Sequence, residues 1–571
     1  MQWLEKCRTY TQVQNDIIDK VATKYKANRF ISSIICERND FDLDKISFFL
    51  ATDFKPLPPS GLKDMDKATD IILDAMSKNQ KIRVESDFDC DGLFSTYILI
   101  QLFDALEYKN FSYHIPHREK DGYGLSVKAV NKAYEDGVSL IITVDNGIAA
   151  FEAVDRANEL GIGVIVTDHH TPFEQLPNSL CIVNPHQKDC TYPQKMLSGG
   201  MVAYKLVQSL INRSSREAKL RFMRQGYNKR IISAAALSAI ADVMDILGEN
   251  RSIVKEGFKY LKEGAIPAVA AIMPEPSVYR VSFGVAPRFN SMGRLHDMTF
   301  SLDYLLETNP AEIEILKEQL EDCNNKRKDM QLLAHSTIRD RVLSYEQMPK
   351  IIIEVSDDMH ESLAGLVAGK LKEEFYRPVI IFAKTSSGTY KASGRSIPEY
   401  NIIKEVTPFF PLISGGGGHA MACGLKADTL DQIEAFKEAL ISACTLTEDQ
   451  LTPKLTVDKF LSFNDDFESI YYSSKLLEPF GTGNPELIYA MRNVRLVTTV
   501  RSYKRGEYAK IKIYENATNT KYIIATCWDE NVFKINNENP PMITMADICF
   551  TMDYSSFSKT IEFTIKSINY L

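Results

Sequence analysis

Three short apolar segments that end in acidic or histidine residues constrain this chain more than any other feature. They are 81–86 followed by Asp87-Phe88-Asp89-Cys90-Asp91-Gly92, 139–144 followed by Asp145-Asn146-Gly147, and 163–167 followed by Asp168-His169-His170. Apolar runs that alternate with amphipathic helical stretches predict a parallel sheet. The carboxyl ends of such strands meet at one edge, where ligands bind. We therefore expect these acids and histidines to converge.

The chain is too long for one hydrophobic core, since its 571 residues exceed the size at which single cores stop growing. We predict an α/β protein in which a parallel-sheet domain is joined by a long helix to a smaller α/β domain, followed by a C-terminal β-barrel. The predicted boundaries are 1–60 for an N-terminal segment, 61–308 for the first domain, 309–347 for the connecting helix, 348–446 for the second domain and 452–571 for the barrel.

Charge and cysteine usage narrow the class of protein. A net charge of −8 argues against a protein that coats nucleic acid through bulk positive charge. The ten cysteines lack CxxC spacing and the N-terminus lacks an apolar signal core, so we expect a cytoplasmic protein, or one in the host cytoplasm if it is viral. The most apolar windows, 231–247 and 265–273, are interrupted by acids or too short to span a bilayer, so we expect no membrane segment.

The converging residues have the composition of a two-metal site. Asp89, Asp91, Asp145, His169 and Asp242 offer four carboxylates and one imidazole, which is more than one ion uses. Oxygen-rich ligands with a histidine suit Mn²⁺, our preferred ion, or Mg²⁺. Two such ions favour hydrolysis of a phosphoester.

Other interpretations remain open for single parts of this site. An isolated Asp-x-Asp-x-Asp-Gly also fits a calcium loop, and adjacent His169 and His170 cannot both point the same way in an extended chain. Asp242 lies in an apolar stretch of helical spacing, 230–263, where an acid is costly unless it is paired or bound to metal, but it also fits a helix-capping acid.

Cations for the phosphates of a substrate are available in polar, glycine-containing segments. Arginine is preferred because its guanidinium binds phosphate in a bidentate manner. The candidates are Arg118, Arg288, Arg294 and Arg395. The glycine run 415–418 beside His419 could present backbone N–H groups to a phosphate, although such a run by itself is more often a flexible loop.

These motifs together resemble the DHH phosphoesterase superfamily, and within it the RecJ-type exonucleases. The resemblance runs from about residue 81 to the C-terminus. It is carried by the three acidic clusters, by Ala241-Asp242-Val243 and the Gly-Gly-His sequence, and by Ile115-Pro116-His117-Arg118, Gly122-Tyr123-Gly124, Val183-Asn184-Pro185, Gly248-Glu249-Asn250-Arg251, Asn290 to Arg294 and Pro479-Phe480-Gly481-Thr482-Gly483-Asn484-Pro485.

The resemblance implies a role for each candidate residue. Asp89 and His169 would hold one ion, Asp91 and Asp242 the other, and Asp145 would bridge them. Asp87 and His170 would support the metals or handle protons. The residues expected to grip the substrate are Arg118, Arg288, Asn290, Arg294, His360, Ser393, Arg395, Ser396, Gly417, Gly418 and His419.

Three departures from the usual pattern concern the pocket more than the ligands. Glu85 stands where several relatives carry histidine, 359–362 reads Met-His-Glu-Ser in place of Trp-His-Pro-Gly, and the run 415–418 has extra glycines. We expect these changes to affect substrate grip.

A basic, aromatic strip distinguishes the C-terminal region. Eight lysines and arginines lie between Arg492 and Lys521, with tyrosines among them, although the strip could be only the outer face of a sheet. By the resemblance this region is an OB fold that binds single-stranded DNA, and tyrosines and Trp528 could stack on bases. The residues expected to contact the strand are Arg501, Tyr503, Lys504, Arg505, Lys510 and Lys512.

The function implied is a metal-dependent 5′-to-3′ exonuclease, specific for single-stranded DNA, that releases mononucleotides in DNA repair or recombination. Two alternatives are a phosphodiesterase of short oligonucleotides or cyclic dinucleotides, and a non-catalytic replication scaffold. We expect a monomer that works with a single-strand-binding protein or a helicase.

Overall fold

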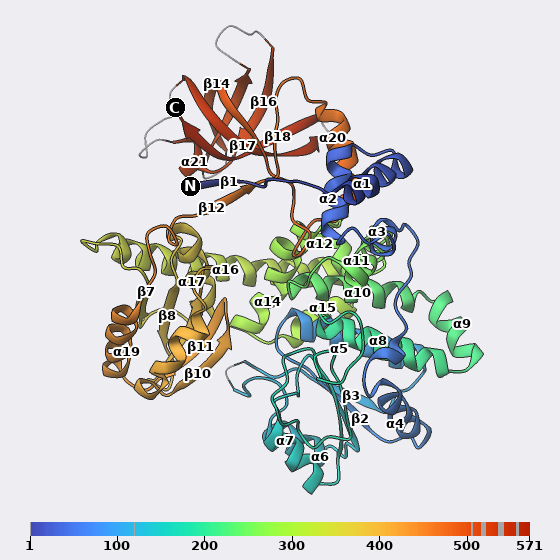
Figure 1. Cartoon of the computed structure of the whole chain (residues 1–571). Helices are drawn as coiled ribbons and strands as arrows, with labels where there is room; N and C mark the ends of the chain where they lie inside the picture. The colour runs from blue at the N-terminus through green and yellow to red at the C-terminus, as the bar shows by residue number, and fades with distance from the viewer. Residues whose placement is uncertain (1, 119, 504–505, 516–520, 535–541, 556–558) are drawn as a thin grey trace. The chain divides into compact units, whose positions relative to one another are not determined.

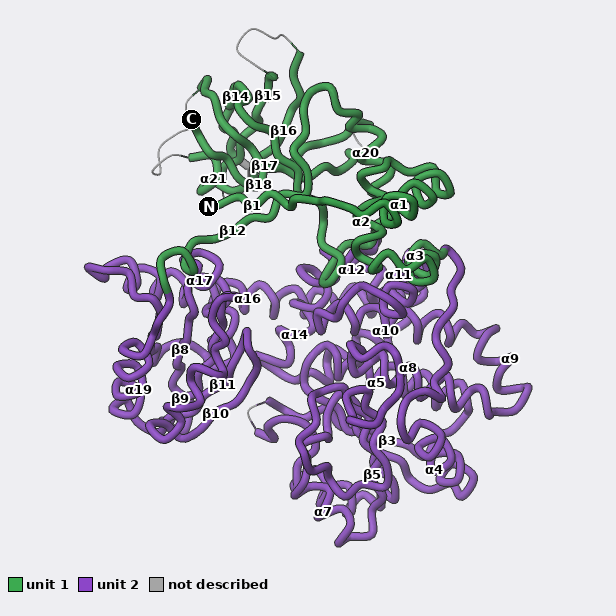
Figure 2. The backbone as a smooth tube through the Cα atoms, in the orientation of Figure 1, with its two compact units in different colours: residues 1–51, 447–571 green, residues 52–446 purple. Residues whose placement is uncertain are grey.

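The computed structural model describes residues 2–118, 120–503, 506–515, 521–534, 542–555 and 559–571. The chain forms two compact units, one of residues 52–446 and one in which residues up to 51 join 447–571 (Figure 2). Among the described residues, no helix is both long enough and apolar enough to cross a membrane.

A five-stranded parallel sheet forms the centre of the first domain (Figure 1). Its order is β3-β2-β4-β5-β6, with β2 at Ile82–Glu85, β3 at Phe111–His114, β4 at Leu140–Val144, β5 at Gly163–Thr167 and β6 at Cys181–Val183. The helices that precede, connect or follow these strands are η1 (Pro59–Gly61), α4 (Met65–Ser77), α5 (Cys90–Ala105), α6 (Val127–Glu135), α7 (Phe151–Glu159) and α8 (Gly199–Arg213). The α/β class and the parallel sheet are confirmed.

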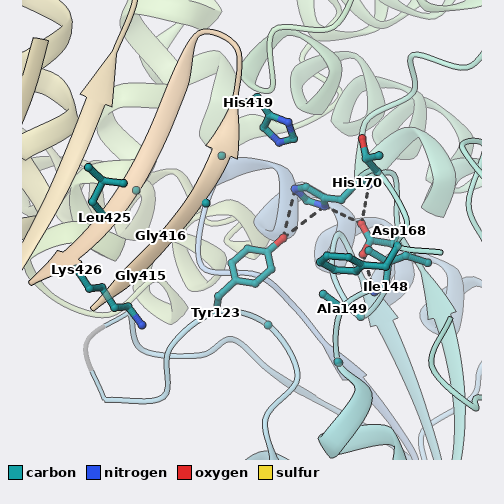
Figure 3. Close-up of a pocket in the computed structure, with 18 of the residues that line it drawn as sticks. Tyr123, Ile148, Ala149, Asp168, His170, Gly415, Gly416, His419, Leu425 and Lys426 are labelled. Carbon is teal, nitrogen blue, oxygen red and sulfur yellow. Dashed lines mark hydrogen bonds and ion pairs between the residues drawn. The ribbon is translucent and has the colours of Figure 1, made fainter. Parts of the chain in front are cut away.

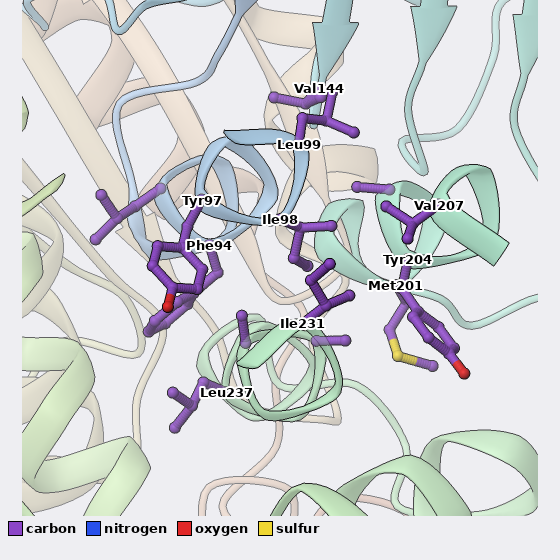
Figure 4. Close-up of a cluster of buried hydrophobic side chains, with 14 of the residues drawn as sticks. Phe94, Tyr97, Ile98, Leu99, Val144, Met201, Tyr204, Val207, Ile231 and Leu237 are labelled. Atoms are coloured by element: carbon purple, nitrogen blue, oxygen red, sulfur yellow. The ribbon is translucent and has the colours of Figure 1, made fainter. Parts of the chain in front are cut away.

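Apolar side chains on both faces of this sheet are buried, as expected for parallel strands. Ile141 packs in the cluster with α6 and α7, whereas its neighbour Ile142 packs in the larger cluster with α5 and α8. Figure 4 shows part of the larger cluster, where Leu99 of α5 lies beside Val144 of β4, and Phe94 of α5 and Met201 of α8 lie on the side of a further helix. This core fixes the strand ends that carry the candidate ligands.

Helices complete the first domain. They are α9 (Arg216–Arg224), α10 (Tyr227–Ala241), α11 (Gly248–Lys262), α12 (Pro267–Ile272), α13 (Val278–Arg280), the π-helical η2 (Val281–Val285), α14 (Ala286–Leu295) and α15 (Thr299–Leu306). The helical spacing over 230–263 belongs to two helices, because α10 ends at Ala241 and Val243 adopts a positive φ of 57°. Asp242 therefore lies at a helix end and not inside a helix.

The 34-residue helix α16 (Pro310–Leu343) leads to a second α/β region. Its mixed sheet has the order β10-β11-β9-β8-β7, with β7 at Ile352–Ser356, β8 at Val379–Lys384, β9 at Tyr390–Arg395, β10 at Gly415–His419 and β11 at Ala422–Ala427. The helices are η3 (Glu361–Leu363), α17 (Ala364–Phe375), α18 (Ile402–Val406), η4 (Thr407–Leu412) and α19 (Leu430–Ala443).

The glycine run is not a loop. It forms β10, which pairs antiparallel with β11 from Gly415 opposite Lys426 to His419 opposite Ala422. The sequence interpretation missed this because glycine weakens strand propensity, while pairing and sheet position override it. β10 is the edge strand, so one side of its backbone has no strand partner in the sheet.

The other unit contains the barrel. Its strands are β14 (Tyr489–Tyr503), β15 (Gly506–Tyr514), β16 (Tyr522–Cys527), β17 (Ile543–Ser555) and β18 (Thr560–Tyr570). They run in the order β14-β15-β16-β18-β17, β17 closes on β14, and β16 pairs parallel with β18. A closed five-stranded barrel of this kind confirms the predicted OB-like barrel.

The first 51 residues belong to the barrel unit, although nothing in their sequence indicated this partner. β1 (Gln2–Glu5) pairs in parallel with β12 (Lys454–Val457), and Arg8 forms an ion pair of 2.8 Å with Asp458. The remaining elements are α1 (Gln12–Tyr25), α2 (Arg29–Arg38), α3 (Leu43–Leu50), β13 (Lys459–Phe460), α20 (Phe467–Ser474), η5 (Lys475–Leu477) and α21 (Glu530–Phe533). The chain leaves this unit at Ala51, whereas we predicted an N-terminal segment reaching residue 60.

Candidate active site

The acidic motif after β2 folds into a tight turn that starts α5. Asp89 caps this helix, and its Oδ1 accepts hydrogen bonds from the backbone N–H groups of Asp91 (2.8 Å) and Gly92 (3.3 Å). A Cβ at Gly92 would lie 2.5 Å from the carbonyl oxygen of Asp87. Only glycine allows this approach, so the final residue of the motif is a requirement of the turn.

Asp91 is held in place by two other elements. Its carboxylate accepts hydrogen bonds from the backbone N–H groups of Gly199 (2.6 Å) and Gly200 (3.0 Å), at the start of α8, and from the hydroxyl of Ser238 in α10. The positive end of a helix dipole stabilises a carboxylate at this position. Asp91 thus joins α5, α8 and α10 at the base of the site.

Asp145 follows β4 in a left-handed conformation with φ of 62°. Such a φ is uncommon for a residue other than glycine and is concentrated at functional sites. A Cβ at Gly199 would lie 2.5 Å from the Cβ of Asp145, so α8 approaches this residue closely. The turn directs Asp145 toward the other acids.

His169 connects three of the acids. Its Nε2 lies 3.1 Å from Asp145 Oδ1, 3.5 Å from Asp242 Oδ2 and 3.6 Å from Asp91 Oδ2. Burial lowers the pKa of His169, which favours the neutral imidazole that binds metals. Residues far apart in the chain therefore share one pocket.

The charges in this pocket fit divalent cations. Three sets of side chains have ligand atoms within 4.8 Å of one another, namely Asp145 with His169 and His170, Asp91 with His169 and Asp242, and Asp87 with Asp89 and Asp145. All seven predicted metal and catalytic residues are among them. Among the described residues, Asp87 Oδ1 and Asp242 Oδ2 are buried without hydrogen-bond partners. The donor set of carboxylates and imidazole suits Mn²⁺ or Mg²⁺.

Without a cation, the ionised carboxylates of this cluster are destabilised, and their raised pKa values reflect this. Burial, and then the charges of Asp91 and Asp89, raise the pKa of Asp145 well above its usual value. The same causes raise the pKa of Asp242, whose side chain is 31% exposed, to about 9. Without a metal, burial and the neighbouring like charges therefore favour the protonated form of these carboxyl groups.

His170 belongs to a second hydrogen-bonded group at the rim. Its Nδ1 lies 2.7 Å from Asp168 Oδ1, and the Tyr123 hydroxyl lies 3.3 Å from its Nε2 (Figure 3). Burial lowers the pKa of His170, but the hydrogen bond and charge of Asp168 outweigh burial and raise it to about 9. In the metal-free protein this raised pKa favours the protonated imidazole of His170 at neutral pH.

A cleft of about 1340 Å³ opens beside this group. Tyr123, Asp168 and His170 line one side of the cleft (Figure 3). The other side is lined by the edge strand β10, which includes His419, and by Lys426 of the neighbouring strand β11. This volume is large enough for a nucleotide, and β10 contributes a backbone edge without side chains from Gly415 to Gly418.

A group of arginines lies near the acidic turn. Burial, and then the charges of Arg118, Arg327 and Arg395, lower the pKa of Arg294 to about 10. Arg395 donates to Ser393 Oγ (2.8 Å) and Arg294 to the carbonyl oxygen of Ser362 (2.6 Å), which are neutral acceptors. Mutual repulsion among buried guanidinium groups favours a bound anion such as phosphate.

Comparison with known proteins identifies the family. Residues 81–240 match the DHH family, N-terminal domain, and residues 348–445 match the DHHA1 domain. The single-stranded-DNA-specific exonuclease RecJ of Escherichia coli is 33% identical over 409 residues, which cover 67% of this chain and 69% of that protein. The RecJ of Salmonella typhimurium is 35% identical over 400 residues, with the same coverage. The chain belongs to the RecJ family.

Solved structures agree with this assignment. RecJ from Thermus thermophilus in complex with Mn²⁺ has a TM-score of 0.79 at 22% identity, covering all of this chain and 79% of that one. A second exonuclease RecJ bound to manganese has a TM-score of 0.57 at 28% identity, covering 69% of this chain and 98% of that one. The three-part RecJ fold predicted from the sequence is confirmed, and the metal-dependent exonuclease class follows.

Several residues expected to grip the substrate have structural contacts of their own in this RecJ-family chain. Arg288 forms an ion pair of 2.6 Å with Glu321 of α16, and Ser396 is buried and donates to the carbonyl oxygen of Tyr400. Asn290 Oδ1 accepts from the N–H of Cys90 (3.0 Å) and so supports the acidic turn. His360 Nδ1 lies 2.8 Å from Ser362 Oγ at the start of η3. Their contacts with DNA stay a prediction.

In the barrel, part of the expected DNA-binding set shares one surface pocket. Arg501, Lys510 and Lys512 line it together with apolar residues of β16 and β18. Lys512 lies over the ring of Tyr522, and the rings of Tyr508 and Trp528 stack 4.9 Å apart. Lys504 and Arg505 lie outside the described residues, as does the side chain of Tyr503.

The sequence interpretation missed several residues that support the site. Ser238 holds Asp91, and its position four residues before Asp242 was the available signal. Tyr123 was noted only as part of a motif, although its hydroxyl reaches the carbonyl oxygen of Asp145 (3.4 Å) as well as His170. Gly199 and Gly200 carried no signal in the sequence. Arg327 was hidden among the charged residues of α16.

Proposed function

We propose that this chain degrades single-stranded DNA from its 5′ end and releases mononucleotides during DNA repair or recombination. The observation that carries the proposal is the convergence of Asp87, Asp89, Asp91, Asp145, His169, His170 and Asp242 in one pocket of a RecJ-family chain. The names of its relatives supply the substrate class. We further propose a cytoplasmic monomer that works with a single-strand-binding protein or helicase.

The residues divide the work of phosphodiester hydrolysis among them. Asp89 and His169 would hold one cation, Asp91 and Asp242 the other, and Asp145 both. Bound divalent ions supply an activated water and neutralise the charge that develops on the phosphate. The arginine group formed by Arg118, Arg294, Arg327 and Arg395 would hold substrate phosphate oxygens by bidentate hydrogen bonds.

His170 is proposed to move the proton that this reaction requires. Water oxygen bonds to phosphorus as the bond from phosphorus to the 3′ oxygen of the terminal nucleotide breaks. That oxygen needs a proton, and the protonated Nε2 of His170 is a suitable donor because Asp168 holds the positive charge from the other side of the ring. Tyr123 beside Nε2 would orient the ring.

The direct test uses single strands labelled at the 5′ or the 3′ end, with Mn²⁺ present. We expect mononucleotides to appear first from the 5′-labelled strand, and duplex DNA to resist. Release of label from the 3′ end first, or equal digestion of duplex, would contradict the proposal.

Calorimetry with Mn²⁺ separates an enzyme from a scaffold, since a scaffold without functional ligands binds no metal.

A charge reversal on the barrel separates the exonuclease from a hydrolase of short oligonucleotides. The double substitution Lys510→Glu and Lys512→Glu is expected to weaken binding of a long single strand and to reduce its salt dependence, because two phosphate contacts are lost. Affinity measured by fluorescence anisotropy at several salt concentrations checks this. The control is Lys219→Glu in the other unit, which reverses the charge of a lysine outside the barrel. Unchanged affinity for long strands would favour the short-substrate hydrolase.

A further inference from the structure

An exposed pair of aromatic rings precedes the helix that supports the acidic turn. Tyr279 and Phe283 are both 71% exposed, and their ring centroids lie 4.9 Å apart. Removing aromatic surface from water is favourable, so large rings that remain this exposed side by side often mark binding sites. Neither residue carries any of the functions described above.

The backbone around the pair is also unusual. Residues Val281–Val285 form a π-helical turn between α13 and α14, and the helix continues without a break from Val278 to Leu295. Single π-helical turns are rare and occur frequently at functional sites, since they change the direction in which side chains project. Here the turn lies at the aromatic pair itself.

The pair and two residues of the site belong to the same continuous helix. Phe283, in the π-helical turn, precedes Asn290 by seven residues and Arg294 by eleven. Asn290 accepts from the backbone of Cys90 in the acidic turn, and Arg294 belongs to the arginine group. One helix therefore links the aromatic pair to the metal pocket.

We propose that Tyr279 and Phe283 form a stacking platform for an unpaired base of the DNA strand, on the 3′ side of the cleaved phosphate. This proposal rests on the proposed exonuclease function, which places the 5′ end in the metal pocket and the rest of the strand outside it. Stacking on aromatic rings suits any base and so fits a nuclease that tolerates every sequence. Arg280 beside the pair donates to the carbonyl oxygen of Glu275 (2.8 Å), a neutral acceptor, and keeps its charge for a phosphate.

The helix sets the distance between the platform and the pocket. At 1.5 Å per residue, Phe283 lies about 10 Å from Asn290 and about 16 Å from Arg294 along the axis. A strand that keeps the stacked spacing of duplex DNA, roughly 3.4 Å per nucleotide, covers this distance in about three to five nucleotides. The platform is therefore expected to meet one base at that separation from the 5′ end.

The test combines a variant with strands that lack single bases. Full-length Asp145→Asn protein, which should bind without cutting, is titrated with 5′-phosphorylated single strands that carry one abasic site at successive positions. We expect a loss of about 5- to 150-fold in affinity at one or two positions three to five nucleotides from the 5′ end, corresponding to the stacking of one base. The double variant Tyr279→Ala, Phe283→Ala should bind the intact strand equally weakly and lose nothing further at those positions.

Matched controls keep the result interpretable. Tyr134→Ala removes a comparably exposed ring, 56% exposed on α6, and should leave the abasic profile unchanged. The variant Tyr279→Phe, Phe283→Tyr keeps both rings and should restore binding.

A flat abasic profile, or an alanine variant that binds within twofold of the parent, overturns the platform even if the wild type digests DNA. An alanine variant with unchanged DNA affinity but an altered oligomeric state also overturns it, because the rings would then be a protein contact. Failure of the wild type to digest single strands would instead count against the proposed function.

Discussion

Asp145→Asn protein is expected to release mononucleotides at least about 10³-fold more slowly than the wild type, because several kcal/mol of transition-state stabilisation depend on the metal pair. Asp145 belongs to two of the three possible ligand sets and lies 3.1 Å from His169, so its replacement affects the whole pocket. Asparagine keeps the size of the side chain and removes the charge. The measurement is a single-turnover rate with a labelled strand and saturating Mn²⁺.

The fold should survive this substitution. In the metal-free protein the Asp145 carboxyl costs stability when it is ionised, since burial and neighbouring acids raise its pKa. The thermal midpoint of metal-free Asp145→Asn is therefore expected to equal or exceed that of the wild type. Asp155→Asn changes an exposed acid of α7 and should leave the rate unaltered. A rate for Asp145→Asn within tenfold of the wild type would remove this residue from the metal site.

Mn²⁺ affinity is expected to rise at least about 10-fold between pH 6 and pH 7, which is the second large effect. Burial raises the pKa of Asp242 to about 9 and those of Asp87 and Asp145 well above the usual value, so the metal-free pocket holds at least one proton at neutral pH. Metal binding displaces the bound protons, and each displaced proton contributes a factor of about ten per pH unit. Calorimetry in buffers of different ionisation enthalpy measures both the affinity and the number of protons released.

The stability of the metal-free protein should change with pH in the opposite direction. A carboxyl whose pKa is higher in the folded protein contributes stability below its unfolded pKa of 3.8, and that stability is lost as the pH rises toward about 9 for Asp242. The metal-free thermal midpoint should therefore fall from pH 5 to pH 8, while Mn²⁺ removes most of this fall. Asp242→Asn should release about one proton fewer. A pH-independent affinity would mean that the carboxylates are already ionised without metal.

The predicted fold succeeded where local pattern and tertiary environment agree. The runs before Asp87, Asp145 and Asp168 are short and apolar with helical stretches between them, a combination that favours a buried parallel sheet whatever the rest of the chain does. Local pattern and tertiary environment disagree at Gly415 to Gly418. The local propensity of the glycines predicts a loop, but their pairing with β11 makes this segment a strand. Pattern and environment also disagree at Asp242, where apolar neighbours hid the end of α10.

In the candidate site, the ligands could likewise be predicted from the sequence, whereas the residues that position them could not. Ligands such as Asp89, Asp145 and His169 were recognisable because acids and histidines at strand ends carry a chemical signal of their own. The groups that position them, such as Gly199 and Ser238, are small residues whose role depends on which backbone lies beside them. Likewise, Arg288 and Arg294 are equivalent in the sequence, yet one is paired with Glu321 and the other joins the arginine group.

By itself, the sequence determined the class of fold, the chemistry of the pocket and the residues able to bind metal, because periodicity and side-chain type are local properties. Only the tertiary structure decided which carboxylates hold protons, which arginines gather beside the acidic turn, and that the first 51 residues join the barrel unit. These properties depend on burial and on neighbours distant in the chain, and desolvation and pairing have no counterpart in the order of the residues.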